Sequence, residues 1–195
     1  MEISLIRHGK SRCVAQHRIA VKDVAHWIEC YDDSGVFEEH SFPPETLKRV
    51  TEASMVVTSD LHRSIESARL LNSKAPIISL PLFREAELPI LSDQFGKIKL
   101  TPNEWIVILR GLWLAGYSRE CESLNQAKQR ARTACEQLVS YVHEYESIAV
   151  VGHGFFNQLI AKKLRQMGWK GGRITNRQHW GCTTYFMKNS QKHSH

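Results

Sequence analysis

The chain has little that marks a metalloprotein, a secreted protein or a membrane protein. No CxxC pair or zinc-finger spacing occurs among its odd set of five cysteines, Cys13, Cys30, Cys121, Cys135 and Cys182. The most apolar window, residues 105–117, contains Arg110 and is shorter than the roughly 20 residues that span a bilayer. The start of the sequence lacks the basic segment and apolar core of a signal peptide. We therefore expect reduced thiols, no bound metal, no membrane contact and a cytoplasmic location.

Long runs of one charge are also missing. The formal net charge of +6 favours an acidic partner, but no basic run exceeds a pair such as Lys162-Lys163. Scattered basic residues do not suit nucleic acid, and we expect a phosphorylated small molecule as the partner. The sequence shows no internal repeat or low-complexity segment, and it leaves the oligomeric state open.

The chain does contain alternating strand and helix patterns. Short apolar runs predict strands at residues 3–6, 55–58, 75–82, 147–152 and 182–187. Apolar residues at helical spacing predict helices at residues 43–53, 61–72, 102–116, 122–145 and 155–167. Residues 11–42 suggest a helix start followed by long loops, and residues 90–102 are expected to be irregular.

This alternation predicts an α/β fold, a three-layer sandwich with a mostly parallel central sheet and helices on both faces. A chain of 195 residues with 42% hydrophobic residues fits a single domain with a sizeable core. We place that domain at residues 1–188, with a helical insertion around 90–122 and a disordered tail at 189–195.

Two of the predicted strands end in a histidine followed by a glycine. His8 follows the first strand and Arg7, and His153 precedes Gly154 after the strand at 147–152. If these strands are neighbours in a parallel sheet, both imidazoles lie at the same edge. Gly154 also opens a helix, whose free N–H groups favour an anion. Arg63, in the first turn of the helix at 61–72, can reach the same place.

These residue types suit the hydrolysis of a phosphate monoester. Guanidinium groups stay charged and form paired hydrogen bonds to phosphate oxygens, which is the role we assign to Arg7 and Arg63. A neutral imidazole can attack phosphorus, and His8 is the candidate nucleophile. His153 would stabilise the charge of the transferring phosphoryl group. This chemistry needs neither a metal nor a cofactor.

The leaving oxygen needs a proton, which a nearby carboxylic acid can donate. Glu85 and Glu87 are both candidates for that acid, and the residues alone do not choose between them. Upstream, Ser59 and Asp60 offer a capping oxygen for the helix that carries Arg63.

Four motifs occur in the order found in the histidine phosphatase superfamily, the phosphoglycerate-mutase-like proteins, which the chain resembles. They are RHGKS at the first strand, SDLHRSIESA around Arg63, FREAELP around Glu85, and VGHG ending at Gly154. The resemblance implies that His8 accepts the phosphoryl group and that Glu85 is the proton donor. It also implies that Arg7, Arg63, His153 and Gly154 contribute to the phosphate pocket, with Ser11 supplying a hydrogen bond.

The chain departs from the family pattern at several positions. Lys10 stands where Glu or Gln is usual, and Val14 where an asparagine often binds phosphate. The segment after Glu85 lacks the FGxWEG-like continuation typical of the mutases. We therefore expect a phosphomonoester hydrolase acting on a small phosphorylated metabolite through a phosphohistidine. The alternatives are a weakly active phosphate-binding or regulatory module and, less favoured, a phosphoglycerate-type mutase.

Overall fold

The centre of the molecule is a six-stranded sheet with the strand order β4-β3-β6-β1-β8-β7. The computed structural model describes residues 1–14, 17–71, 74–92 and 98–188, so the tail expected at 189–195 lies outside the described residues. The parallel strands are β1 (Glu2–Arg7), β3 (Met55–Thr58), β4 (Ile77–Ser79) and β6 (Ser147–Gly152). The antiparallel strands at one edge are β7 (Lys170–Gly171) and β8 (Cys182–Phe186).

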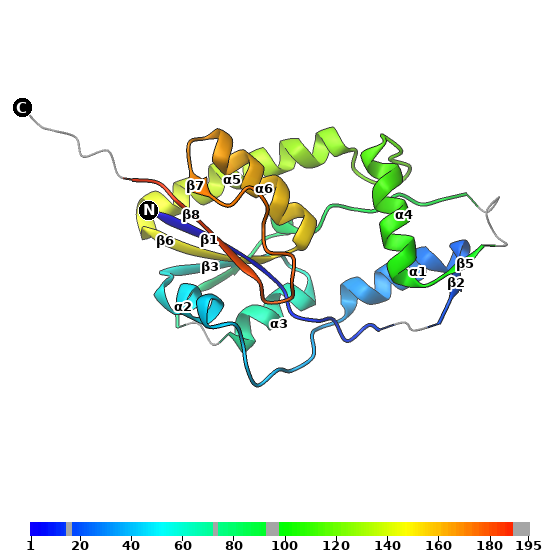
Figure 1. The fold of residues 1–195 in the computed structure, drawn as a ribbon, viewed down its shortest axis with the longest axis horizontal. Helices are drawn as coiled ribbons and strands as arrows, with labels where there is room; N and C mark the ends of the chain where they lie inside the picture. The colour runs from blue at the N-terminus through cyan, green and yellow to red at the C-terminus, as the bar shows by residue number, and fades with distance from the viewer. Residues whose placement is uncertain (15–16, 72–73, 93–97, 189–195) are drawn as a thin grey trace, which may run out of the picture.

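Helices cover both faces of this sheet (Figure 1). One face carries α5 (Leu124–Tyr145) and α6 (Gly154–Gln166), and the other carries α2 (Pro44–Glu52) and α3 (His62–Leu70). Alternate side chains of β1 pack into the two layers, with Ile3 and Leu5 against α5 and α6 and with Ile6 on the opposite face. The predicted three-layer α/β architecture is confirmed.

A side lobe lies beyond the carboxyl ends of the parallel strands (Figure 1). It consists of β2 (Ile19–Ala20), α1 (Val21–Asp33), β5 (Lys99–Leu100) and α4 (Pro102–Leu114). Its apolar core joins Val21 and Val24 to Trp105, and the Trp105 indole N–H donates to the Ile19 carbonyl over 3.0 Å. For residues 11–42 we expected a helix start followed by long loops; the structure has a full helix, α1, followed by an irregular segment at 34–43. The helix there runs for 13 residues, because its buried side supports it although most other positions are polar.

A short 3₁₀ turn, Pro81–Phe83, leads from β4 into the extended segment that carries Glu85. All five cysteines are free thiols. None of the helices in the described ranges is long and apolar enough to cross a membrane.

Candidate active site

His8 and His153 lie side by side at the carboxyl ends of two neighbouring strands. Strands β1 and β6 pair in parallel with Arg7 opposite Gly152, so the next residue of each strand is a histidine at the same edge. The two ring centroids are 5.2 Å apart, and the rings meet edge to face. His8 is 3% exposed and His153 is fully buried. The sheet therefore brings together the two imidazoles that the sequence pattern paired.

The surroundings of His8 keep its Nε2 free of a proton. Its Nδ1 lies 2.7 Å from the Gly9 carbonyl oxygen, which can only accept, so Nδ1 carries the hydrogen. Burial, followed by the positive charge of Arg63, holds the pKa of His8 well below its usual value. At neutral pH the ring is uncharged, and the Nε2 lone pair is available to attack an electrophile.

His153 has one bonded and one unbonded ring nitrogen. Its Nε2 is 2.7 Å from the Ser59 hydroxyl, whereas its Nδ1 is buried without a hydrogen-bond partner among the described residues. Burial and the charge of Arg63 also hold the pKa of His153 well below its usual value. A buried polar atom without a partner is uncommon in native proteins, so Nδ1 is a candidate contact for a ligand.

Arg63 is almost completely buried and is held by the end of α1. Its Nη1 donates to the Asp32 carboxylate over 2.8 Å and to the Tyr31 carbonyl over 3.2 Å. Its guanidinium carbon lies 4.5 Å from the centroid of the Tyr31 ring. Its Nε has no partner within the described part of the chain. The guanidinium is thus fixed in place while part of it can still bind an anion.

Arg7 is fixed from the opposite side of the site. Its Nη1 donates to the Arg177 carbonyl, and its buried Nε also lacks a partner among the residues that the structure describes. A Cβ at Gly154 would lie 3.5 Å from both Cδ and Nε of Arg7, an ordinary van der Waals contact, so the start of α6 packs against this side chain. Three nitrogen atoms of this site therefore lack a hydrogen-bond partner in the described part of the chain: Arg7 Nε, Arg63 Nε and His153 Nδ1. Such a donor set suits the oxygens of a phosphate.

The Glu85 carboxylate sits at the N-terminus of α6. It accepts backbone N–H bonds from Phe156 over 2.8 Å, from Phe155 over 3.1 Å and from Ala86 over 2.9 Å. We expected a bound anion to use the free N–H groups of this helix, but Glu85 of the chain itself bonds two of them. The Glu87 carboxylate instead accepts from the Glu122 backbone over 2.8 Å. Of the two candidate acids, Glu85 is the one attached to the helix that follows His153.

Ser11 is buried, and its hydroxyl oxygen accepts from the Cys13 backbone N–H over 3.2 Å. Within the described ranges, no hydrogen bond links it to the two histidines or the two arginines. The neighbouring Lys10 lies over the Phe37 ring at 5.8 Å, and Val14 is 48% exposed. The structure therefore places Ser11 in the segment after β1, where it forms an antiparallel bridge with Val36.

The sequence pattern missed several residues that contact this site. Asp32 and Tyr31 hold Arg63, Ser59 bonds His153, and the ring centroid of His179 lies 5.8 Å from that of His8. None of these four belongs to a strand-end His-Gly pair. The dipeptide His179-Trp180, which follows a polar turn, is the one local signal that could have drawn attention to His179.

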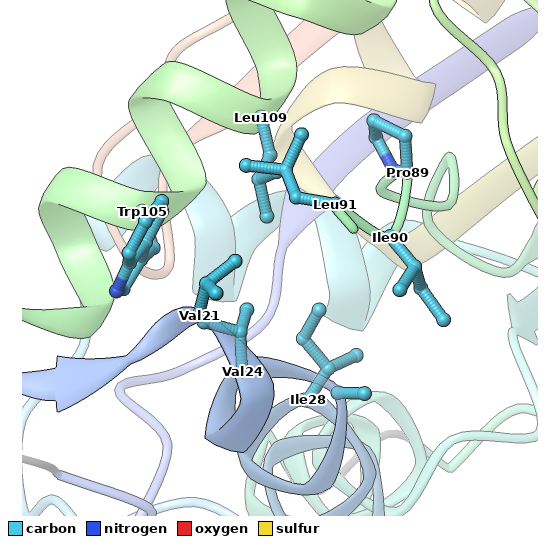
Figure 2. A pocket seen from close by; sticks show the side chains of 9 residues that line it. Val21, Val24, Ile28, Pro89, Ile90, Leu91, Trp105 and Leu109 are labelled. Carbon is cyan, nitrogen blue, oxygen red and sulfur yellow. The ribbon is translucent and has the colours of Figure 1, made fainter. Parts of the chain in front are cut away.

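A separate hollow lies within the side lobe and is lined by apolar side chains (Figure 2). It encloses about 250 Å³, its open mouth included, between α1, α4 and residues 89–91. Its walls include Val24, Ile28, Ile90, Leu91 and Leu109. None of the described side chains that line it is titratable. Within the described residues, no cluster of His, Cys, Asp and Glu is arranged to hold a metal ion.

The two buried histidines predict a loss of stability in mild acid. In the unfolded chain each takes up a proton near pH 6.5, whereas the native pKa values are lowered, so the unfolded state binds more protons below that pH. The free energy of unfolding should fall by up to about 1.4 kcal/mol per pH unit for each histidine. Urea unfolding between pH 7.5 and 5.5 measures this slope.

The contribution of one histidine can be isolated by comparing variants. His153→Gln should show a shallower dependence of stability on pH than the wild type, and the exposed His143→Gln should keep the wild-type slope. If the slopes of His153→Gln and the wild type are equal, His153 is not held neutral in the native state.

Comparison with known proteins gives the chain its family. Residues 40–191 match the family model of the histidine phosphatase superfamily, branch 1. This range contains Arg63, Glu85 and His153, and His8 precedes it. The phosphoglycerate mutase-like protein 4 of Arabidopsis thaliana is 24% identical over 180 residues, which cover 90% of this chain and 76% of that protein.

Solved structures share the fold at low sequence identity. One is the product of an open reading frame of Mycobacterium tuberculosis, with a TM-score of 0.62 and 14% identity over 97% of this chain and 92% of that one. Another is a phosphoserine phosphatase of Entamoeba histolytica in complex with 3-phosphoglyceric acid. Its TM-score is 0.56, with 15% identity over 95% of this chain and 90% of that one. Because the family model matches well over half of its length, the chain belongs to the histidine phosphatase superfamily, branch 1.

Proposed function

We propose that the protein is a cytoplasmic phosphomonoester hydrolase that acts on a small phosphorylated metabolite through a phosphohistidine at His8. Family membership supports phosphatase or mutase activity in general. One observation supports hydrolysis through a phosphohistidine at His8. The uncharged His8, whose Nε2 is free, lies beside His153 and Arg63. Each of these two residues has a buried nitrogen without a hydrogen-bond partner in the described part of the chain.

The first half of the proposed reaction transfers the phosphoryl group to the enzyme. Arg7, Arg63 and His153 bind the non-bridging oxygens, and His8 Nε2 attacks phosphorus in line with the leaving oxygen. The N–P bond forms while the P–O ester bond breaks, and Glu85 gives its proton to the leaving oxygen.

The second half returns the enzyme to its starting state. The Glu85 carboxylate takes a proton from water as that water attacks the phosphohistidine. The P–O bond to water forms, the N–P bond breaks, and inorganic phosphate leaves with His8 neutral again. The same side chain thus acts as acid in one step and as base in the next.

A panel of substrates tests this proposal. Sugar phosphates, nucleotides, phosphoglycerates and phosphopeptides are incubated with the protein, and free phosphate and isomeric products are both measured. We expect release of free phosphate from at least one small metabolite, at the same rate with and without EDTA. Faster formation of an isomeric product would contradict the hydrolase and favour a mutase.

The second candidate function is a phosphate-binding or regulatory module with weak turnover. The Asp32 carboxylate favours it, because it already bonds Arg63 and must be accommodated when a phosphate binds there. In this case calorimetry should show phosphate binding while the whole panel gives negligible hydrolysis. Measurable hydrolysis of a small phosphate ester would argue against the module.

A further inference from the structure

The segment Arg177–Gly181, between β7 and β8, is bonded along the RHG motif. The Trp180 N–H donates to the Arg7 carbonyl over 3.0 Å, and the Arg7 N–H donates to the Gly181 carbonyl over 3.0 Å. The Arg7 side chain also donates to the Arg177 carbonyl. These bonds fix His179, which lies between the bonded residues, beside the nucleophile.

Trp180 takes up a strained backbone conformation within this segment. Its φ of 63° lies in the left-handed region that side chains other than that of glycine rarely adopt. Its indole packs over Gly9 so closely that a Cβ at Gly9 would come within 2.1 Å of the ring. Strain of this kind persists only where the surrounding structure enforces it, and it gathers at functional sites. The consequence here is the position of the preceding side chain, His179.

His179 uses one ring nitrogen for a hydrogen bond and lies close to the His8 ring. Its Nδ1 lies 3.1 Å from the His8 carbonyl oxygen, which can only accept, so Nδ1 carries a hydrogen. Its Nε2 has no hydrogen-bond partner among the described residues. The side chain is half-buried, and its ring centroid lies 5.8 Å from that of His8 at a tilt of 48°. His179 is therefore close enough to His8 to contact an oxygen of a phosphoryl group that is bound at His8.

We propose that His179 is a third imidazole of the site, which takes up a proton when a tetrahedral dianion binds and donates it from Nε2 to an anion oxygen. This inference rests on the proposed function, because it assumes that the phosphoryl group binds at His8. It adds a substrate-binding residue outside the four sequence motifs. It also predicts that the protein takes up a proton on His179 when the anion binds, and that no other group of the site supplies this proton.

The charges around His179 set the conditions for this uptake. Burial and then the charge of Arg7 lower the pKa of His179, and Lys10 acts in the same direction. The bond to the His8 carbonyl and the charge of Glu39 act in the opposite direction. Without a ligand the ring is therefore neutral at neutral pH. A bound dianion favours the imidazolium, so binding should weaken as the pH rises.

Inorganic sulfate is a suitable probe, because it keeps its double negative charge throughout the range in which histidine titrates. Calorimetry of sulfate binding in buffers of different ionisation enthalpy gives both Kd and the number of protons taken up. His179→Asn keeps a side-chain N–H that can donate to the His8 carbonyl but removes Nε2. We expect it to bind sulfate about 10- to 100-fold more weakly than the wild type and to take up fewer protons.

The control variant is His143→Asn, an exposed histidine on α5, which should bind sulfate like the wild type. If His179→Asn and the wild type have equal Kd values and equal proton uptake, His179 does not bind the anion and serves only through its hydrogen bond to the His8 carbonyl. This result would overturn the inference. Absence of sulfate binding by the wild type would overturn it as well. Sulfate binding that depends on His179 in a protein without hydrolytic activity would instead refute the proposed function alone.

Discussion

Replacement of His8 by alanine is expected to reduce hydrolysis by about 10³-fold or more, because the variant lacks the imidazole nitrogen that we propose to form the covalent bond to phosphorus. The measurement is the steady-state rate with para-nitrophenyl phosphate in the presence of EDTA. The buried environment of His8 leaves its Nε2 without a proton, so the wild type should need no separate base to activate the nucleophile.

The covalent intermediate gives a second readout of the same variant. Wild-type protein quenched during turnover of a labelled substrate should carry an acid-labile phosphoryl group, and His8→Ala should carry none. His143→Ala, on the exposed side of α5, serves as the matched control and should be labelled like the wild type. Full activity in His8→Ala would rule out the phosphohistidine route.

Glu85→Gln is expected to slow the hydrolysis of some substrates more than others, depending on whether their leaving group needs a proton to depart. In the proposed mechanism Glu85 supplies the proton that an alkyl leaving group needs, so hydrolysis of an alkyl phosphate should fall by about 10²- to 10⁴-fold. Para-nitrophenolate leaves without that proton, so the first turnover should remain fast. The later turnovers should be slow, because the attacking water has lost its base. Rapid-mixing kinetics should therefore show a burst of one equivalent of para-nitrophenol.

Glu87→Gln is the matched control for this prediction. The Glu87 carboxylate bonds the Glu122 backbone, so its loss should leave the rates on both substrates close to those of the wild type. The glutamine at position 85 can still accept from the N-terminus of α6 through its amide oxygen. If Glu87→Gln slows the alkyl phosphate while Glu85→Gln does not, the roles of the two glutamates are reversed.

The parts of the fold predicted best from the sequence are those whose pattern depends on burial alone. The strand expected at residues 147–152 is β6, and the strand expected at 55–58 is β3, because strands buried on both faces read as continuous apolar runs. Helix α1 was harder to predict, since only Val21 and Val24 of its 13 residues are buried. The antiparallel direction of β8 depends on the path of the chain after α6, which no local pattern contains.

In the candidate site, too, features set by local pattern could be predicted from the sequence, whereas contacts set by packing could not. The neighbouring positions of His8 and His153 follow from strand ends, and the sequence pattern was sufficient for them. Ser59 was expected to cap a helix, yet α3 begins at an N-cap, Leu61, that makes no side-chain capping bond, while the Ser59 hydroxyl bonds His153. The contact of Asp32 with Arg63 likewise depends on how α1 packs on α3. Partners far apart in sequence are set by packing rather than by local preference.

The position of β1 in the sheet also bears on how the protein is synthesised. Among the strands of this sheet β1 is made before the others, yet its two neighbours are β6, at residues 147–152, and β8, at residues 182–186. At about 5 to 20 residues per second, a ribosome needs roughly 10 to 35 s to reach β8 after finishing β1. Until β6 is made, the apolar strand that precedes His8 has no partner along either edge, and such edges favour aggregation. His8 is thus in place only once both β6 and β8 have left the ribosome.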